Sequence, residues 1–529
     1  MRLLSAMSLL ACCAAFAAPG CAESTESTSD EDAESLEPLP PPGKEDGQYR
    51  KGLPVNVDAS RTGVWTVKNQ WQDTTTAEAK KAGLAWAAES DLTWDEKYGA
   101  WVGSLQWIDG VDGYSKTVEL TTPWGKTLPS PSLECAEMAL FLRVTFAAWY
   151  QLPLQLEAMD GGKLVYFGHF GVRTATGRYA NAPEYKIKYK DLSTADWQTT
   201  WPQDTGLRKR RVAGGEDNQI ELRDGAVFGE YLDEIHLNKR AAHFTIMVLD
   251  YLGSMNLADA ANGYNIVPES VRGGDYLIER WQRSGIGHTL VVKDVVPIGE
   301  GNLDVTTISG SMPRRQGKQE SGIASKSYFT SPYTGGEGTN SDGHQYAKLG
   351  GGVKRFRVAK AINGFWSNTW MNGDEAHWIN STDTARIAAR PARFGSLLGQ
   401  VSPEQQRTEL LAQIADARHH IGNYPASCSA RERRETAFRS LYDIEARSFG
   451  RTAAQVDADH RDLEDYVFGE LEYTKSKTCC WNSSTAGMHD IVMQQAQAEL
   501  AAADANGTCV EPVVFKSRAD GYTRWATYA

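Results

Sequence analysis

The sequence predicts an α+β fold, and three segments support this prediction. An almost wholly apolar helix is expected from Leu133 to Tyr150, directly after a proline-containing turn. Three strand-like segments follow between Val271 and Ile308, each bounded by glycine-containing turns. From Pro403 onward, Ala, Gln, Glu and Arg recur at helical spacing. A buried helix, consecutive strands and a separate helical region together favour an antiparallel α+β domain followed by helices.

The first 20 residues have the pattern of a secretory signal peptide. Met1-Arg2 precedes an apolar stretch from Leu3 to Ala18, and small residues lead up to Cys21. The apolar stretch is too short to serve as a transmembrane helix. Small residues directly before a cysteine resemble the lipobox of bacterial lipoproteins. That resemblance implies a lipid on Cys21 as a membrane anchor and, because Ala22 rather than Asp follows, the outer membrane. The alternative is an ordinary cleaved signal, with Cys21 left as a stray thiol.

Residues 21–52 are expected to form a disordered acidic linker between that lipid and the folded part. They are rich in Ser, Thr, Glu, Asp and Pro and offer almost nothing to bury. The whole chain carries a formal net charge of −12, which argues against nucleic acid as a partner. The remaining residues, with 41% hydrophobic side chains in the chain overall, provide for a substantial core.

Residues 53–400 are interpreted as one α+β domain. In its strongest helix Ser132 is the expected N-cap, and the apolar composition predicts burial on most sides. Residues 151–240 are read as strands and long loops with an insertion around 175–240, and residues 311–352 as a loop region. The other expected elements are a helix at 73–89, strands at 63–67, 99–107 and 114–120, a helix at 243–252, and strands at 271–278, 289–296 and 303–308.

Residues 401–529 are expected to form a helical, disulfide-bonded region. The spacing predicts helices at 403–421, 430–447, 452–468 and 486–504. This region holds Cys428, Cys479, Cys480 and Cys509. Because an exported chain meets an oxidising compartment, these four should form two disulfides, with three possible connectivities. Adjacent Cys479 and Cys480 should take different partners, since a vicinal disulfide is strained.

Cys135 is then the odd cysteine, far from the others in sequence. It lies near the start of the predicted helix, where the helix dipole and exposed amides lower the pKa of a thiol. That is the usual setting of a cysteine nucleophile. The alternative interpretation is a small apolar core thiol, because cysteine is often buried.

Two glycine-containing segments suggest a partner for this thiol. Gly274-Asp275-Tyr276-Leu277-Ile278, followed by Gly287-His288-Thr289-Leu290-Val291-Val292, resembles the paired strands of the papain-like superfamily, in its NlpC/P60 and CHAP branch. The resemblance implies a papain-like core, with the nucleophile helix packed on an antiparallel sheet. It also implies that His288 is the general base for Cys135. The two residues are 153 positions apart, which exceeds the usual spacing and requires the insertion.

A third polar group should orient the imidazole, and the resemblance places it on the strand after His288. Asp304 is the first choice, because a carboxylate would also stabilise an imidazolium. Asn302, Thr307 or Ser309 are alternatives on the same segment. His169 is a second candidate for the base. The backbone amide of Cys135 could supply one oxyanion donor.

These residues predict an envelope-anchored cysteine hydrolase. By resemblance, its substrate is an amide bond in a peptide or a peptidoglycan stem peptide, and an amine in place of water would give a transferase. No cofactor or metal is implied. The alternative is a non-enzymatic lipoprotein that binds an envelope polymer or a partner protein.

Overall fold

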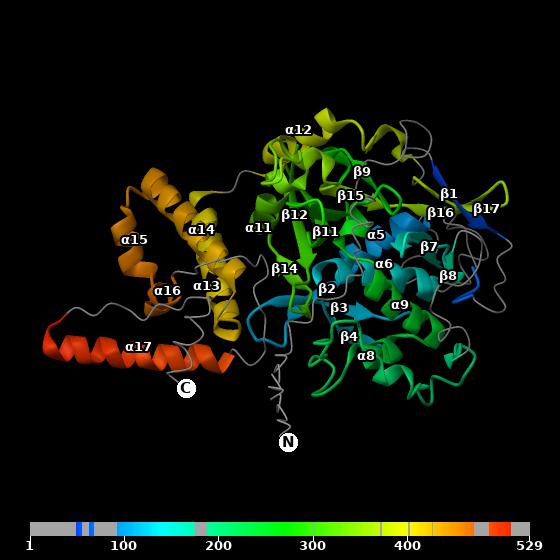
Figure 1. The fold of residues 1–529 in the computed structure, drawn as a ribbon, viewed down its shortest axis with the longest axis horizontal. Helices are drawn as coiled ribbons and strands as arrows, with labels where there is room; N and C mark the ends of the chain where they lie inside the picture. Colours follow the sequence, from blue (N-terminus) through cyan, green and yellow to red (C-terminus); the bar gives the residue numbers. More distant parts are fainter. Residues whose placement is uncertain are drawn as a thin grey trace, which may run out of the picture. The chain divides into compact units, whose positions relative to one another are not determined.

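A ten-stranded antiparallel sheet forms the centre of the computed structural model (Figure 1). The structure describes residues 49–55, 63–67, 93–174, 188–299, 301–370, 373–399, 402–425, 427–469 and 486–508. The strands of the central sheet, in spatial order, are β18 (Trp378–Ile379), β9 (Gly263–Ile266), β15 (Gly352–Phe356), β10 (Tyr276–Glu279), β11 (His288–Gly299), β12 (Asn302–Ser309), β14 (Lys318–Glu320), β3 (Lys116–Thr121) and β2 (Gln106–Asp109), with β4 (Thr127–Pro129) beside β3.

Three smaller antiparallel sheets accompany it. Their members are β1 (Tyr49–Pro54), β17 (Phe365–Thr369) and β16 (Val358–Ile362); β5 (Ser132–Leu133) and β13 (Arg315–Gln316); and β6 (Gln155–Asp160), β7 (Lys163–Gly168) and β8 (Gly171–Thr174). The helices that accompany these sheets are α5 (Trp94–Ser104), α6 (Cys135–Tyr150), α8 (Phe228–Ile235), α9 (Lys239–Tyr251), α10 (Ser254–Ala258), α11 (Gly322–Phe329) and α12 (Thr384–Leu397). The predicted α+β class with antiparallel sheets is therefore confirmed.

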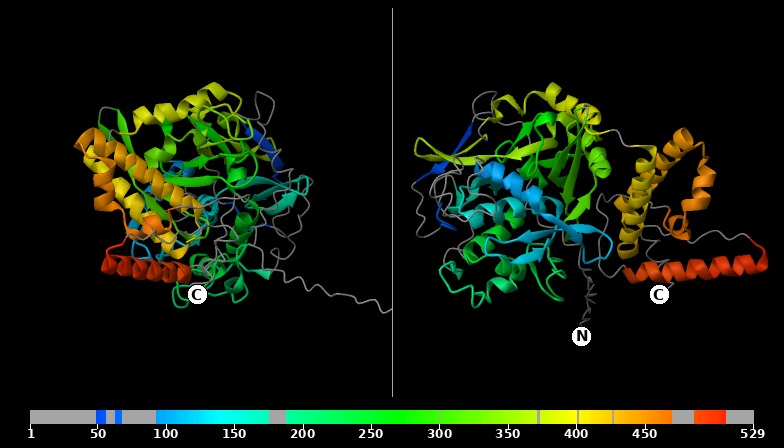
Figure 2. Two further views of the ribbon diagram at one scale, coloured as in Figure 1. Left: turned by 60° about the vertical axis from the view of Figure 1, so that its left-hand side comes forward. Right: turned by 180° about the vertical axis from the view of Figure 1, so that it is seen from behind.

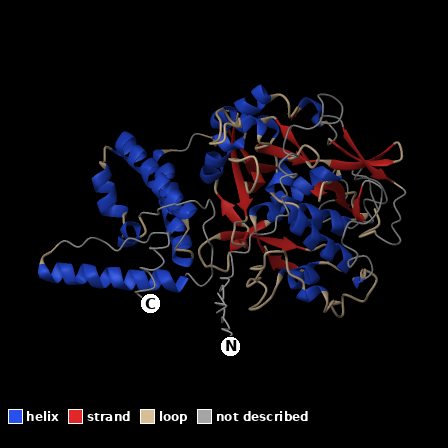
Figure 3. Ribbon diagram, in the orientation of Figure 1, coloured by secondary structure: helices blue, strands red, loops and turns tan. Residues whose placement is uncertain are grey.

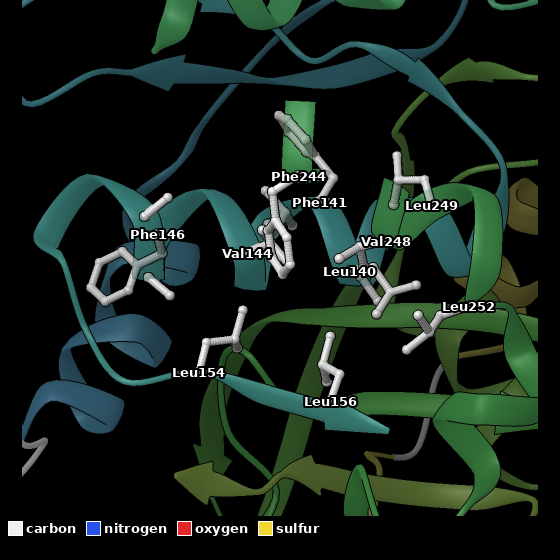
Figure 4. Packing of buried hydrophobic residues seen from close by; sticks show 14 of the residues in the cluster. Leu140, Phe141, Val144, Phe146, Leu154, Leu156, Phe244, Val248, Leu249 and Leu252 are labelled. Atoms are coloured by element: carbon white, nitrogen blue, oxygen red, sulfur yellow. The ribbon is translucent and has the colours of Figure 1, made fainter. Parts of the chain in front are cut away.

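Helix α6 is the best-buried helix of this part, as its composition predicts. Every residue from Ala136 to Tyr150 is buried. It packs on β11 and against α9, and Figure 4 shows its apolar side chains facing those of α9 and β6. Arg143, the one basic residue of the helix, is buried too and forms an ion pair with Asp95 of α5 at 2.6 Å. A buried charge requires such a partner.

The two faces of the central sheet belong to different cores. Tyr276, Ile278, Val291 and Ile308 pack into the cluster that contains α6. The residues next to these along β10 and β11 point to the other face. They are Leu277, Leu290 and Val292, and they pack with Phe329 of α11 and Phe394 of α12. Strand residues alternate between faces, so the apolar pattern of β10 and β11 shows that helices cover both sides.

The described residues from Pro403 onward are helical, and the strands lie earlier in the chain (Figure 3). The helices are α13 (Pro403–Asn423), α14 (Cys428–Ile444) with a π-helical extension (Glu445–Phe449), α15 (Ala453–His460), α16 (Leu463–Val467) and α17 (Ala486–Asn506). They agree with the predicted ranges, except that the helix expected at 452–468 is interrupted at Arg461-Asp462. Within the described residues, no helix is both long and apolar enough to cross a bilayer.

The chain forms two compact units. One contains the described residues up to Asp416 together with Arg434–Arg461, and the other contains Ala417–Arg433 with the described residues from Asp462. In the second unit, Ile421, Phe468 and Val492 share a small core. In the first, Phe438, Leu441 and Val456 form a helical cluster of their own. Each unit therefore has apolar burial of its own.

Several predicted elements differ in the structure. The strand predicted at 99–107 is wrong, because α5 occupies 94–104 and a strand begins only at Gln106. No strand forms at 63–67, which is a bend. The loop region at 311–352 contains helix α11 and two short strands (Figure 2). Strands expected within 151–240 are confined to 155–174 among the described residues. The helix expected at 73–89 lies outside the described residues.

Candidate functional site

Cys135 is the first residue of α6 and retains a half-buried thiol. The N-cap is Glu134 rather than the predicted Ser132, which lies in strand β5. The backbone N–H of Glu134 donates to Oε2 of Glu137 at 2.8 Å, which fixes the first turn. The thiol donates a hydrogen bond to the carbonyl oxygen of Gly287 at 3.6 Å. Helix α6 therefore brings the sulfur to the residue that precedes His288.

The loop that carries Gly287 is held in place by buried polar contacts. Its backbone N–H donates to the hydroxyl of Ser254, the first residue of α10, at 2.9 Å. The buried guanidinium of Arg280 donates to the carbonyls of Gly285 and Arg283, both at 2.9 Å. A Cβ on Gly287 would lie 2.5 Å from the carbonyl oxygen of Glu279, so only glycine fits. These contacts fix the carbonyl that faces Cys135.

His288 begins β11, one peptide bond beyond that carbonyl. In a trans peptide the carbonyl oxygen is about 2.8 Å from the next Cα. With the 3.6 Å contact, the sulfur lies within about 6.4 Å of the His288 Cα, roughly the reach of an imidazole side chain. The structure therefore brings the Cys135 sulfur to the end of β11 at which His288 begins. Helix α6 packs on one face of the sheet, whereas Leu290 and Val292 of β11 belong to the core on the opposite face.

The surroundings of His288 come mainly from the α11 side of the sheet. By strand alternation it shares a face with Leu290 and Val292, which belong to the core under α11. Its ring centroid lies 5.6 Å from that of Tyr328 on α11, at an interplanar angle of 50°. The half-buried imidazole is thus bordered by an aromatic ring on one side.

Asp304 is wrong as the group that orients His288. On β12 it pairs with Val296 of β11, eight residues beyond His288. At about 3.3 Å per residue this is about 26 Å along the strand. Its side chain is exposed and lies against the start of α11, where a Cβ on Gly322 would meet its Oδ1.

Of the three alternatives on β12, Ser309 lies nearest to His288. It pairs with Leu290, whereas Thr307 pairs with Val292 and Asn302 with Gly299. The hydroxyl of Ser309 donates to Oε1 of Glu320 at 2.6 Å and accepts from Arg315 at 3.0 Å. The Ser309 hydroxyl is therefore already hydrogen-bonded to Glu320 and Arg315. Its strand partner, Leu290, lies two residues beyond His288.

A carboxylate that the sequence argument missed is the strand partner of His288. Glu279, the last residue of β10, pairs directly with His288 in the antiparallel ladder. Burial raises the pKa of Glu279 to about 7, and a hydrogen bond from the Ser331 hydroxyl opposes that rise. The signal was present in the sequence: a hairpin places the last residue of one strand opposite the first of the next.

His169, the second candidate for the base, is a core residue. Its Nδ1 lies 3.1 Å from the backbone nitrogen of Leu154, and its ring packs on Trp366 at 4.4 Å. Burial lowers the pKa of His169 to about 3. Leu154 follows the C-terminal end of α6, and Cys135 begins that helix. The 16 residues of α6 thus separate them, about 24 Å at 1.5 Å per residue.

Charged side chains anchor the start of α6. Arg314 donates to both carboxylate oxygens of Glu137, at 2.9 and 2.7 Å, and to the carbonyl of Ala213 at 3.0 Å. Its guanidinium also lies 3.6 Å from Glu134. Carboxylates near a helix N-terminus are favoured by its dipole, and the Arg314 charge balances them. The segment after β12 closes the site, because the Ser311 N–H donates to the Leu133 carbonyl at 3.2 Å.

The other predicted cysteine sites are not tested by this geometry. Cys21, Cys479, Cys480 and Cys509 lie outside the described residues, and so does the side chain of Cys428, which begins α14.

No protein-family model, curated protein or solved structure matches this chain.

Proposed function

We propose that this protein is a cysteine hydrolase of the papain-like, NlpC/P60-like type, with Cys135 as nucleophile and His288 as general base. One observation carries the proposal: the thiol at the start of a buried helix contacts Gly287, directly before His288, across 152 residues of sequence. A nucleophilic thiol needs a base within hydrogen-bond reach, and the contact with Gly287 supports the adjacent His288 as that base.

In the proposed reaction the Cys135 thiolate attacks an amide carbonyl, and His288 takes the thiol proton and returns it to the leaving amine. Water then hydrolyses the thioester, with His288 again acting as base. We propose the backbone amide of Cys135, at the start of α6, as one donor to the oxyanion. We propose a peptide or peptidoglycan stem peptide as the substrate.

We also propose that the chain is exported and anchored to the outer membrane by a lipid on Cys21. This agrees with an acidic chain whose proposed catalytic groups lie beyond residue 52. The linker predicted at 21–52 is wrong at its end, because residues 49–52 belong to strand β1. A lipid-anchored hydrolase would act on polymers of the envelope.

Alkylation by iodoacetamide near pH 7 tests the proposed pair, with the modified peptide located by mass spectrometry. Cys135 should be modified at least about tenfold faster than free cysteine, and His288→Ala should abolish that excess. Cys135→Ala should also abolish the release of new amino groups from peptidoglycan. Asp304→Asn is the matched control, since that side chain is exposed and far along β12.

An inert Cys135 thiol, or one whose rate is unchanged in His288→Ala, would overturn the proposal. A reactive thiol without amide hydrolysis would overturn the assigned reaction.

A further inference from the structure

We propose that Glu279 is the positioning residue that orients His288 and adjusts its charge, in the place where the sequence suggested Asp304. This inference rests on the proposed function. It is carried by the register of the β10–β11 hairpin, in which Glu279 and His288 are direct partners. Directly opposed side chains in an antiparallel pair share one face, with Cβ atoms about 5 Å apart. A carboxylate and an imidazole at that separation can form a hydrogen bond.

The hairpin holds this pair tightly. The Gly287 contact with the Glu279 carbonyl leaves no room for a Cβ, so the two strand ends are in close register. The Ser331 hydroxyl donates to the Glu279 carboxylate and restricts its rotamers. The Tyr328 ring lies 5.6 Å from the imidazole ring. The carboxylate is thus held by the Ser331 hydroxyl at the end of β10 that pairs with the start of β11.

His288 is the basic residue that the strand register sets opposite Glu279. Strand β15 presents Gly352 opposite Ile278, and α11 presents Tyr328. Arg280, the next residue, directs its guanidinium to the carbonyls of the 283–285 loop. The guanidinium of Arg390, in α12, donates to the carbonyls of Gly351 and Val353. Glu279 is therefore placed to pair with His288 rather than with an arginine.

This arrangement has a chemical consequence near neutral pH. Burial raises the pKa of Glu279 to about 7, so the carboxylate becomes ionised as the pH passes that value. An ionised carboxylate beside the imidazole favours the imidazolium, and the imidazolium in turn favours the Cys135 thiolate. The three groups should titrate as a coupled set.

The test is the pH profile of Cys135 alkylation by iodoacetamide, measured from pH 5 to 9 on the full chain. The unmodified chain should show an inflection near pH 7. Glu279→Gln keeps the size of the side chain and removes its titration, so the inflection should vanish and the rate at pH 8 should fall about tenfold. Asp304→Asn is the control. It removes an exposed carboxylate from β12, far along the strand from His288, and should leave the pH profile unchanged. A merely structural role for Glu279 would lower the rate equally at all pH values.

A Glu279→Gln profile that superimposes on that of the unmodified chain would overturn this inference. If His288→Ala still slows alkylation in that case, the proposed function stands and only the role of Glu279 fails. If His288→Ala has no effect, the proposed function fails first.

If the Glu279→Gln variant does not fold, a second measurement, on the unmutated protein, tests the proposed role of Glu279. The His288 ring signal, in protein with labelled histidine and assigned through His288→Gln, should titrate in two steps. A single-step curve would overturn the inference.

Discussion

Three buried histidines make the folded chain sensitive to acid. Burial lowers the pKa values of His169, His236 and His243 to about 3, below their ordinary value of 6.5. Between those values the unfolded chain binds protons that the folded chain does not. The stability that each histidine contributes is therefore fully present above pH 6.5 and is lost as the pH falls toward 3.

Three buried carboxyl groups act in the opposite direction. Burial raises the pKa values of Glu221 and Glu279 to about 7 and that of Asp250 to about 6. In the folded chain these groups keep protons that the unfolded chain releases. Their contribution is fully present below about pH 4 and is lost as the pH rises through 6 to 7.

These opposing effects predict a flat stability profile between about pH 4.5 and 6, with a decline toward pH 3. Each group changes the free energy of unfolding by at most about 1.4 kcal/mol per pH unit, and three act in each direction. The double variant Glu221→Gln/Glu279→Gln removes two of the carboxyl groups. Its free energy of unfolding should therefore rise by up to about 3 kcal/mol per pH unit across that window. Urea unfolding at several pH values measures this slope.

Asp304→Asn serves as the control, because an exposed carboxyl group should not alter the profile. A double variant as flat as the unmodified chain would show that these carboxyl groups are not protonated in the folded state.

At the scale of single residues, the proposed site consists of Cys135, His288 and Glu279. The first two of these were predicted from the sequence. Cys135 and His288 could be found because each begins an element, and both starts have strong local signals. Asp304 could not be judged, since its distance from His288 depends on the β11–β12 register, which the turn at Gly299–Asn302 sets. Glu279 was not predicted because it lies on the strand before His288, whereas the papain-like resemblance places the orienting group on the strand after it.

At the scale of elements, the end of β12 must fit closely against the start of α6. A Cβ on Gly310 would lie 2.4 Å from the carbonyl oxygen of Glu134, a backbone atom. Gly310→Ala should push the two apart, lower the free energy of unfolding by about 1–3 kcal/mol and slow the alkylation of Cys135. Chemical denaturation and the iodoacetamide rate measure the two effects.

The matched control is Gly103→Ala in α5, where a Cβ would make an ordinary contact at 3.5 Å with the Lys293 carbonyl. It should be neutral or stabilise the chain by up to about 1 kcal/mol, since alanine favours helix. Equal effects of the two substitutions would contradict the assigned contact.

The elements around the site were predictable because their patterns are local. Helix α6 follows an apolar run between prolines, and strands β10 and β11 follow apolar runs next to glycine-containing turns. Helix α5 was misread as a strand because its Trp and Gly residues suggest strands, although the Thr93–Glu96 capping box signals a helix start. Helix α11 was missed because its short apolar pattern lies in a Gly- and Ser-rich segment.

At the scale of the whole molecule, the proposed lipid anchor can be separated from the proposed chemistry. Cys21→Ser should move the protein from the membrane fraction to the soluble fraction of the producing cells, because one lipid-bearing residue provides the attachment. The alkylation rate of Cys135 should not change. Cys12→Ser, a change within the expected signal peptide, is the control and should leave the protein in the membrane fraction. Fractionation with immunodetection measures both.

A Cys21→Ser protein that stays in the membrane fraction would point to attachment by another route, or to an uncleaved signal.

The contact between Cys135 and Gly287 also bears on the order of events in folding. It joins residues 152 positions apart, and β3 meets β14 across about 200 residues of chain. Contacts of such high sequence separation carry a large loop-closure cost and form slowly. The thiol and its proposed base should therefore come together only late, after both strands have joined the sheet. Under the proposed function, an incompletely folded chain would have the cysteine but not the activated nucleophile, which would spare neighbouring chains from premature cleavage.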